Sequence, residues 1–124
     1  MTAEWERYCQ SRDLELEGKT VRVTLPGGRA HRVSVADEPD AYRLTAIVVR
    51  ASVASEIETL PVQTWDRNRG TELVGFKIDA KNRLIGEAWV PKAGLTGAEF
   101  GAYVRAVAAE CHRYEYQLTG RDAA

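Results

Sequence analysis

The sequence is poor in the residues from which covalent cross-links and metal sites are usually built. Its 124 residues contain two cysteines and two histidines. Cys9 and Cys111 lie far apart and match no C-x-x-C spacing, so neither a disulfide framework nor a zinc-finger pattern is indicated. We therefore expect both thiols to be free in a reducing cytoplasm, and we expect neither a metal ion nor a cofactor.

Charge of one sign and long apolar runs are also lacking. The net charge is −1, and without a surplus of basic residues the bulk charge does not support binding to nucleic acid. Arg67 and Arg69 fall in the last turn of a predicted helix, where basic residues complement the helix dipole. No apolar stretch approaches the roughly 18 residues of a membrane span. Residues 1–7 do not resemble a signal peptide, so we expect a cytoplasmic protein without membrane contact.

Catalytic sequence motifs are absent as well. We find no nucleophile elbow, phosphate loop, zinc-protease motif or paired-carboxylate pattern. Cys111 and His112 are neighbours on a predicted helix, where consecutive side chains point about 100° apart and do not face each other. His31 is expected to be a partly buried, hydrogen-bonded residue, because only His112 could join it as a ligand and zinc takes about four. We therefore predict no catalytic residues and no enzyme.

The composition is that of a globular domain, with 44% hydrophobic and 28% charged residues, and the chain is long enough to bury a core. No repeat or linker divides it. Hydrophobic periodicity predicts, in order, a helix at 3–12, a hairpin around 21–33, a strand at 42–53, a short helix ending at 68–70, a hairpin over 73–90 and a long last helix.

We accordingly predict a single α+β domain over residues 1–118, followed by a frayed tail at 119–124. Its antiparallel sheet of about five strands packs against the long C-terminal helix and two shorter helices. The last helix is the clearest element, because a capping box at residues 96–99 precedes one unbroken apolar stripe. The stripe consists of Phe100, Val104, Val107, Cys111, Tyr114 and Leu118.

Turn residues predict the register of both hairpins. In the first, a three-residue loop at 26–28 opposes Val23 to His31. In the second, a loop at 80–82 opposes Phe76 to Gly86, which sets large residues opposite small ones on the face that a crossing helix would cover. A two-residue loop would bury a carboxylate opposite Phe76, so we reject it.

The stretch 42–53 is apolar at both odd and even positions, which is typical of a central strand covered on both faces. The predicted helices suffice for one face, so a second copy of the chain is a natural cover for the other. The predicted outward face of the second hairpin also favours a second copy of the chain, because it carries three large apolar side chains where water is expected. The candidate partner-binding or dimer-interface residues are Leu73, Ile85, Trp89 and Lys77.

A competing arrangement keeps the chain monomeric. The first helix could cover the outward apolar residues through Trp5 and Tyr8, which share one face of that helix. A homodimer is the prediction that we carry forward, with the sheet at or near the interface.

The segments 65–69, 76–79, 86–88, 90–91 and 95–96 together resemble the YbjN domain family. The shared features are an Asn-Arg pair that ends a short helix, a hairpin with an Asp-x-x-Asn turn, a Leu-Thr cap and a long amphipathic last helix. This resemblance implies the type III secretion chaperone-like fold, often dimeric. Secretion chaperones of that fold hold an unfolded effector segment on apolar surfaces, whereas the YbjN branch is linked to sensory or stress regulation. The present sequence differs from the secretion chaperones in its short first helix and its lack of strong acidity.

Two functions from different classes therefore stand at this point. The first is a non-enzymatic, chaperone-like or adaptor module that holds a partner protein segment on an apolar sheet surface. The alternative is a small-molecule-responsive sensory or stress regulator with a pocket between sheet and helices, for which Tyr42, Trp65 and Tyr103 supply aromatic side chains.

Overall fold

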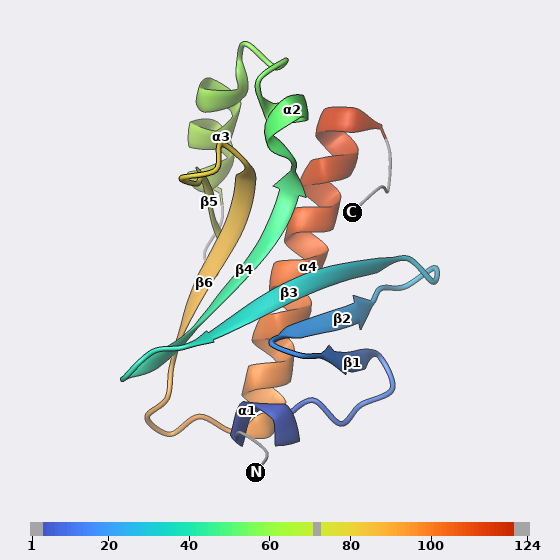
Figure 1. Ribbon diagram of the computed structural model, residues 1–124, viewed down its shortest axis with the longest axis vertical. Helices are drawn as coiled ribbons and strands as arrows, with labels where there is room; N and C mark the ends of the chain where they lie inside the picture. The colour runs from blue at the N-terminus through green and yellow to red at the C-terminus, as the bar shows by residue number, and fades with distance from the viewer. Residues whose placement is uncertain (1–3, 71–72, 121–124) are drawn as a thin grey trace.

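A computed structural model describes residues 4–70 and 73–120 (Figure 1). The elements follow in the order α1 (Glu4–Arg7), β1 (Leu14–Glu17), β2 (Thr20–Thr24), β3 (Ala30–Asp37), β4 (Ala41–Val49), α2 (Ala51–Ala54), α3 (Leu60–Asn68), β5 (Gly75–Ile78), β6 (Leu84–Pro91) and α4 (Gly97–Thr119). The strands of the described residues form one antiparallel sheet in the order β1-β2-β3-β4-β6-β5. The predicted α+β class is confirmed, with six strands in place of five.

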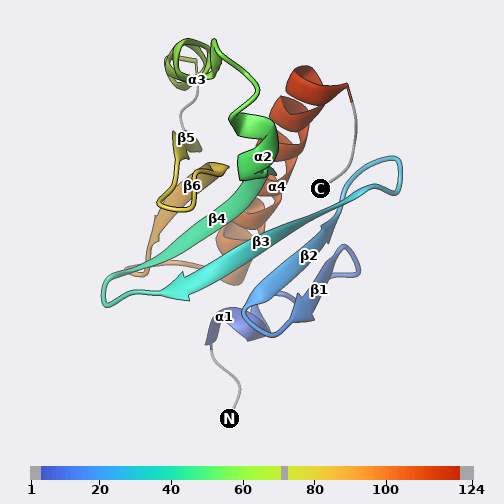
Figure 2. The same ribbon diagram turned by 45° about the horizontal axis from the view of Figure 1, so that its top comes forward.

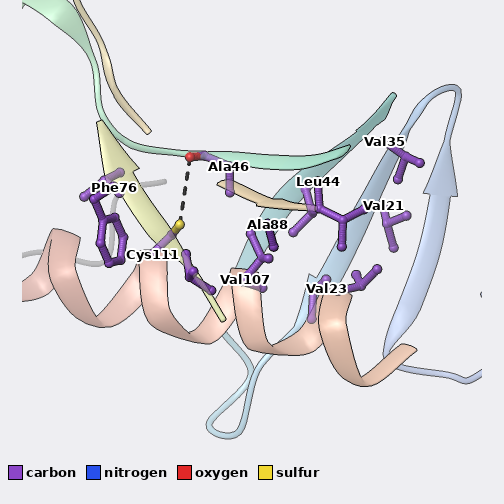
Figure 3. Packing of buried hydrophobic residues seen from close by; sticks show 14 of the residues in the cluster. Val21, Val23, Val35, Leu44, Ala46, Phe76, Ala88, Val107 and Cys111 are labelled. Carbon is purple, nitrogen blue, oxygen red and sulfur yellow. Dashed lines mark hydrogen bonds between the residues drawn. The ribbon is translucent and has the colours of Figure 1, made fainter. Parts of the chain in front are cut away.

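The core lies between this sheet and α4, which runs along one face of it, here called the inner face (Figures 1 and 2). The predicted helix stripe is confirmed, because its first five members are buried and Leu118 packs against the core while partly exposed. Inward side chains of the strands meet the stripe in a single cluster (Figure 3). None of the described helices combines the length and apolar character that crossing a bilayer requires.

The two ends of α4 form as local sequence dictates. The Thr96 hydroxyl accepts a hydrogen bond from the Glu99 N–H at 3.1 Å, and the Glu99 carboxylate accepts the Thr96 N–H at 3.2 Å. This reciprocal capping box satisfies two amide groups that the first turn would leave unpaired. At the other end Gly120 takes the left-handed conformation, with φ 70°, that commonly ends a helix. Residues 121–124 of the expected tail lie outside the described residues.

Both predicted hairpin registers are confirmed. Val23 pairs with His31 in the first, and Phe76 pairs with Gly86 in the second. Asn82 has φ 62°, the left-handed position expected in the loop. The ladder of the second hairpin begins at Gly75, so Leu73, which was expected in the first strand of this hairpin, lies outside it.

The sequence-based prediction of the first 20 residues was wrong in two ways. The first helix ends at Arg7 rather than at residue 12. Strand β1 was missed, although Leu14 and Leu16 alternate with glutamates and Gly18, with φ 67°, allows a two-residue turn into β2. Because β1 is a short edge strand with one buried residue, its period-2 signal was weak.

The strand predicted at 42–53 is also shorter than expected, because β4 ends at Val49 and residues 51–54 form α2. A bulge between Ile47 and Val49 shifts the alternation, so that Val48 and Val49 are both buried. Before the bulge the buried residues alternate with partly or fully exposed ones. The prediction that this strand is apolar on both faces was therefore wrong. Of the apolar residues assigned to its second face, only Ile47 is an exposed strand residue, whereas Val49 follows the bulge and Ala51 and Val53 lie in α2.

Helix α4 approaches the sheet closely at Gly86. A Cβ atom built there would overlap the Cys111 Sγ and would lie 3.1 Å from Val74 Cγ1. The Cys111 thiol also donates to the Ala46 carbonyl oxygen at 3.9 Å (Figure 3). Since no side chain fits between β6 and α4 at this point, glycine permits the helix to lie close to the sheet.

Gly86→Ala should therefore destabilise the protein by about 1–3 kcal/mol, the usual cost of overpacking a core. Gly75→Ala is the matched control, because Gly75 lies on the neighbouring strand and a Cβ there meets nothing within 4 Å. That control should be neutral or stabilising by up to about 1 kcal/mol. Urea unfolding of both variants measures the difference.

The same experiment repeated in a Cys111→Ala background tests the cause. Removing the sulfur atom should reduce the cost of Gly86→Ala, which gives a favourable coupling in the double-mutant cycle. An equal cost in both backgrounds would show that Cys111 is not the atom that Gly86 accommodates.

Candidate protein-binding surface

The sheet has a second face, opposite α4, that we call the outer face. It is formed by the outward side chains of β2 to β6, and its centre consists of Arg43, Thr45, Ile47, Lys77, Ile85, Glu87 and Trp89. In the described part of the chain no helix lies over it (Figures 1 and 2). The arrangement with the first helix as its cover is wrong, because the Trp5 and Tyr8 rings pack against Phe100 of α4 at 6.4 and 5.6 Å.

The four predicted interface residues differ in exposure and in their position relative to the outer face. Trp89 is 54% exposed on the outer face, and the Lys77 side chain is 53% exposed on the neighbouring strand. Leu73 is also exposed, but it precedes β5 and stands outside the ladder. Ile85 lies on the outer face and is nonetheless buried, with 6% exposure.

The burial of Ile85 has a cross-strand cause. It sits on β6 between two paired strands, directly opposite Lys77 of β5 and Ile47 of β4. Side chains that face each other across a ladder shield one another from water. Ile47 is the exposed member of this row, with 41% exposure, and sequence analysis did not assign it to the surface. The sequence signal that could have identified Ile47 is the alternation of inward and outward residues along β4. The bulge after Ile47 interrupts this alternation and obscured it.

Charged groups hold the indole of Trp89 in place. Its Nε1 donates to the Glu87 carboxylate at 3.1 Å, and the Arg43 guanidinium lies 5.7 Å from the ring centroid. Glu87 also pairs with the Lys77 ammonium at 3.2 Å. The Lys77 side chain is 53% exposed, whereas the Glu87 side chain is 16% exposed. The carboxylate that orients the indole is therefore itself largely shielded from water.

A shallow hollow of about 360 Å³ adjoins Ile47 and Ile85 on this side. It lies where β3 leaves β4, because the β3–β4 ladder runs from Ser34 to Asp37 only, and the earlier part of β3 pairs with β2. Its wall includes two arginines. The lining residues are Thr20, His31, Arg32, Ser34, Thr45, Ala46, Ile47, Arg83 and Ile85.

The free edge of β5 is blocked by α3. The Asn68 side chain donates to the Phe76 carbonyl oxygen at 2.9 Å and accepts the Phe76 N–H at 2.8 Å. The Arg67 guanidinium stacks over the Tyr114 ring at 4.3 Å, which holds the end of α3 against α4. The Asn-Arg region is thus structural, and it occupies backbone groups that an added strand would need.

The aromatic residues cited for a small-molecule pocket are not brought together. Tyr42 is buried on β4 with its ring 5.3 Å from that of Phe100. Trp65 is 63% exposed on α3, where the Arg69 guanidinium lies 5.0 Å from its ring centroid. Other residues line the larger hollow of about 680 Å³, between the end of β4, α2 and α4.

The architecture defines a class of protein: an antiparallel sheet with a long C-terminal helix on one face, the type III secretion chaperone-like fold. Similar chains occur in the "Crystal Structure of the ExsC-ExsE Complex" (TM-score 0.62, 19% identity, 94% of this chain and 89% of that chain). Another similar chain occurs in the ExoU-SpcU heterodimer from the type III secretion system of Pseudomonas aeruginosa (TM-score 0.62, 12% identity, 98% of this chain and 100% of that chain). A third is found in the Yersinia pestis type III secretion chaperone SycH bound to a fragment of YscM2 (0.51, 9%, 87% and 91%).

At these identities the likeness concerns the fold. Neither a family model nor a curated protein matches the sequence. The fold that the resemblance to YbjN domains implied is therefore observed, while membership of that family stays a prediction.

The hairpin that carries Trp89 and Lys77 is closed by Asp79, and this turn generates a pH prediction. The Asp79 carboxylate accepts the Arg83 Nε–H at 2.8 Å, the Arg83 N–H at 2.9 Å and the Lys81 N–H at 3.0 Å. These donors, with the Arg83 side chain first, lower the pKa of Asp79. A carboxyl group whose pKa is lower in the folded state than in the unfolded state raises the free energy of unfolding at pH values above its unfolded pKa, about 3.9. This contribution disappears as the pH falls through the pKa of the folded state.

Asp79→Asn should therefore be less stable than the wild type near neutral pH, and the gap should narrow as pH falls below about 4. Urea unfolding between pH 3 and pH 7 measures this. Asp66→Asn is the control at neutral pH, because the Asp66 side chain is 74% exposed and its removal should change stability little. A gap that stayed constant down to pH 3 would contradict the assigned role of the charge.

Proposed function

We propose that this chain is a non-enzymatic, chaperone-like module that binds a segment of another protein on the outer face of its sheet. The observation that carries the proposal is the exposure of Trp89 and Ile47 on a sheet face with no described helix over it. Large apolar side chains grouped on a surface mark interaction sites, and tryptophan is a frequent anchor in them.

The comparisons support this proposal through the fold. The similar chains come from complexes, one of them described as a type III secretion chaperone with a fragment of a second protein. The present chain has a net charge of −1 and a short first helix, features in which it differs from secretion chaperones. We therefore carry over protein binding, and we do not carry over export.

The state of the two thiols supports the non-enzymatic part of the proposal. Burial raises the pKa of Cys9 to about 11 and the pKa of Cys111 to about 12. A nucleophilic cysteine needs the opposite shift, because the thiolate is the reactive form. Both residues serve as small apolar groups in the core.

The chemistry of the surface describes its partner. Trp89 and Ile47 offer apolar contact, while Arg32 and Arg83 line the adjoining hollow. Both arginines already pair with carboxylates of this chain, Arg32 with Glu17 and Arg83 with Asp79. The partner that fits this surface is therefore a segment with two or three apolar anchors. The blocked β5 edge directs such a segment onto the face rather than onto that edge.

Peptides selected from a random displayed library against the wild-type protein should lose affinity on the order of thirtyfold or more when Trp89 is replaced by Glu, the effect of removing a hot spot. Tyr116→Glu is the matched control, because Tyr116 is 56% exposed on α4. Fluorescence anisotropy of the selected peptides measures both affinities.

Peptides that bind Trp89→Glu as well as the wild type would place the site elsewhere. In that case Trp65→Glu tests the second group of exposed apolar residues, which lies around α3. Loss of binding in this variant alone would refute the outer face as the binding surface.

We also propose that a second copy of the chain occupies the outer face when no partner is bound. Burying a large apolar side chain gains roughly 1.5–3 kcal/mol, and a two-fold interface uses the same patch on both subunits. Light scattering behind size exclusion should give a dimer at micromolar concentration, a monomer for Trp89→Glu and a dimer for Tyr116→Glu.

A selected peptide should convert the wild-type dimer into a monomer with one bound peptide. A monomeric wild type that binds peptides through Trp89 would refute the dimer and leave the protein-binding proposal standing. A dimer that persists in Trp89→Glu would show that the subunits meet through another surface.

A further inference from the structure

The only two histidines of the sequence meet in the folded protein. His31 belongs to β3 and His112 to α4, and their ring centroids lie 5.7 Å apart with the rings nearly perpendicular, at 86°. Glu115 follows three residues after His112 on the same face of the helix. One ring nitrogen of each histidine and one carboxylate oxygen of Glu115 all lie within 4.8 Å of one another.

This cluster is deeply buried. His31 is 1% exposed and Glu115 is 5% exposed, and the His112 side chain retains 16% exposure. Polar groups at such depth require specific partners. Three donor groups of the kinds that bind transition metals therefore converge on one buried point.

The orientation of His31 provides a second, independent observation. Its Nε2 lies 2.8 Å from the Ile47 carbonyl oxygen, and because a carbonyl can only accept, Nε2 carries the proton. In the neutral imidazole with this tautomer, Nδ1 presents a lone pair. This Nδ1 is buried and has no hydrogen-bond partner within residues 4–70 and 73–120. A histidine that binds a metal characteristically donates its other nitrogen to a backbone carbonyl in this way.

The position in the fold gives the cluster a structural role. His31 lies on the part of β3 that has left β4, where no ladder joins the two strands. Its bond to Ile47 spans this seam, and the two α4 ligands close it from the inner side. Glu115 also borders the hollow of about 680 Å³ at the end of β4.

We propose that His31, His112 and Glu115 bind one zinc ion that links β3 to α4 across this seam. Two imidazoles and one carboxylate suit zinc, which completes its four-coordinate shell with water where the protein supplies three ligands. Magnesium and calcium prefer shells made of oxygen alone. Zinc ligands at about 2.0–2.1 Å from the ion lie roughly 3.4 Å apart in a tetrahedron. His112 Nδ1 and Glu115 Oε1 are 3.9 Å apart, so a small side-chain rotation brings them to that spacing.

Sequence analysis considered His31 with His112 and expected no metal site, because it found no further ligand. Glu115 is the ligand that it missed. His112 and Glu115 are three residues apart on a helix, a common arrangement, and their partner is remote in sequence. Only the crossing of α4 over β3 brings His31 to them.

The test uses tag-free protein, so that these are the only imidazoles in solution. Titration with zinc chloride should give one ion per chain and raise the melting temperature as the ion saturates the folded state. Glu115→Gln and His112→Gln should each weaken zinc binding by more than the roughly 10–100-fold that loss of an outer partner costs. Glu110→Gln is the matched control, because it removes a partly exposed carboxylate from the same helix and should leave the affinity unchanged.

One measurement on the wild type does not depend on how the variants fold. Zinc should shift the imidazole NMR signals of both histidines together, with saturation at one equivalent, and cobalt should give the visible absorption of a tetrahedral site. Zinc that shifts neither imidazole, or that binds both ligand variants as tightly as the wild type, would overturn the proposal. Magnesium at the same concentration should leave the signals unchanged, and an equal response to magnesium would likewise overturn it.

Discussion

The contact between Cys111 and Gly86 is the constraint on which the rest of the structure depends. It brings α4 so close to β6 that a Cβ atom has no room between them. The apolar stripe of the helix can then meet the inward side chains of five strands at once, from Val21 to Val90. Because α4 covers only the inner face, it leaves the outer face of the sheet without a helix over it in the described part of the chain (Figure 1).

That one-sided burial connects the fold to its proposed function. Most of the buried apolar side chains lie in the core on the inner face, and the outer face keeps Trp89 and Ile47 exposed beside charged groups. The short helices do not cover the outer face. Trp5 of α1 packs against Phe100 of α4, and Asn68 of α3 binds the backbone of β5 at its free edge. The proposed partner segment would therefore meet a face with apolar anchors, which suits protein binding.

The seam between β3 and β4, where their ladder stops at Ser34, is the second feature that shapes the proposed sites. Where the ladder stops, His31 replaces backbone pairing by a side-chain bond to Ile47, and it turns its second nitrogen toward α4. The same opening produces the hollow on the outer face. A metal ion at the inner side of this seam would stiffen the strand that forms one wall of the proposed binding surface, which links the two proposals physically while their tests remain separate.

Local interactions of the sequence by itself determined the capping box at Thr96, the stripe of α4 and the registers of both hairpins, because each of these depends on residues within a few positions of one another. The resemblance also led to the correct fold. Tertiary structure alone decided that β4 ends in a bulge, that Ile85 is covered by its cross-strand neighbours while Ile47 is exposed, and that His31 meets His112 and Glu115. These features depend on which strands lie side by side and where a helix crosses them, and such contacts between remote residues leave no periodic signal in the chain.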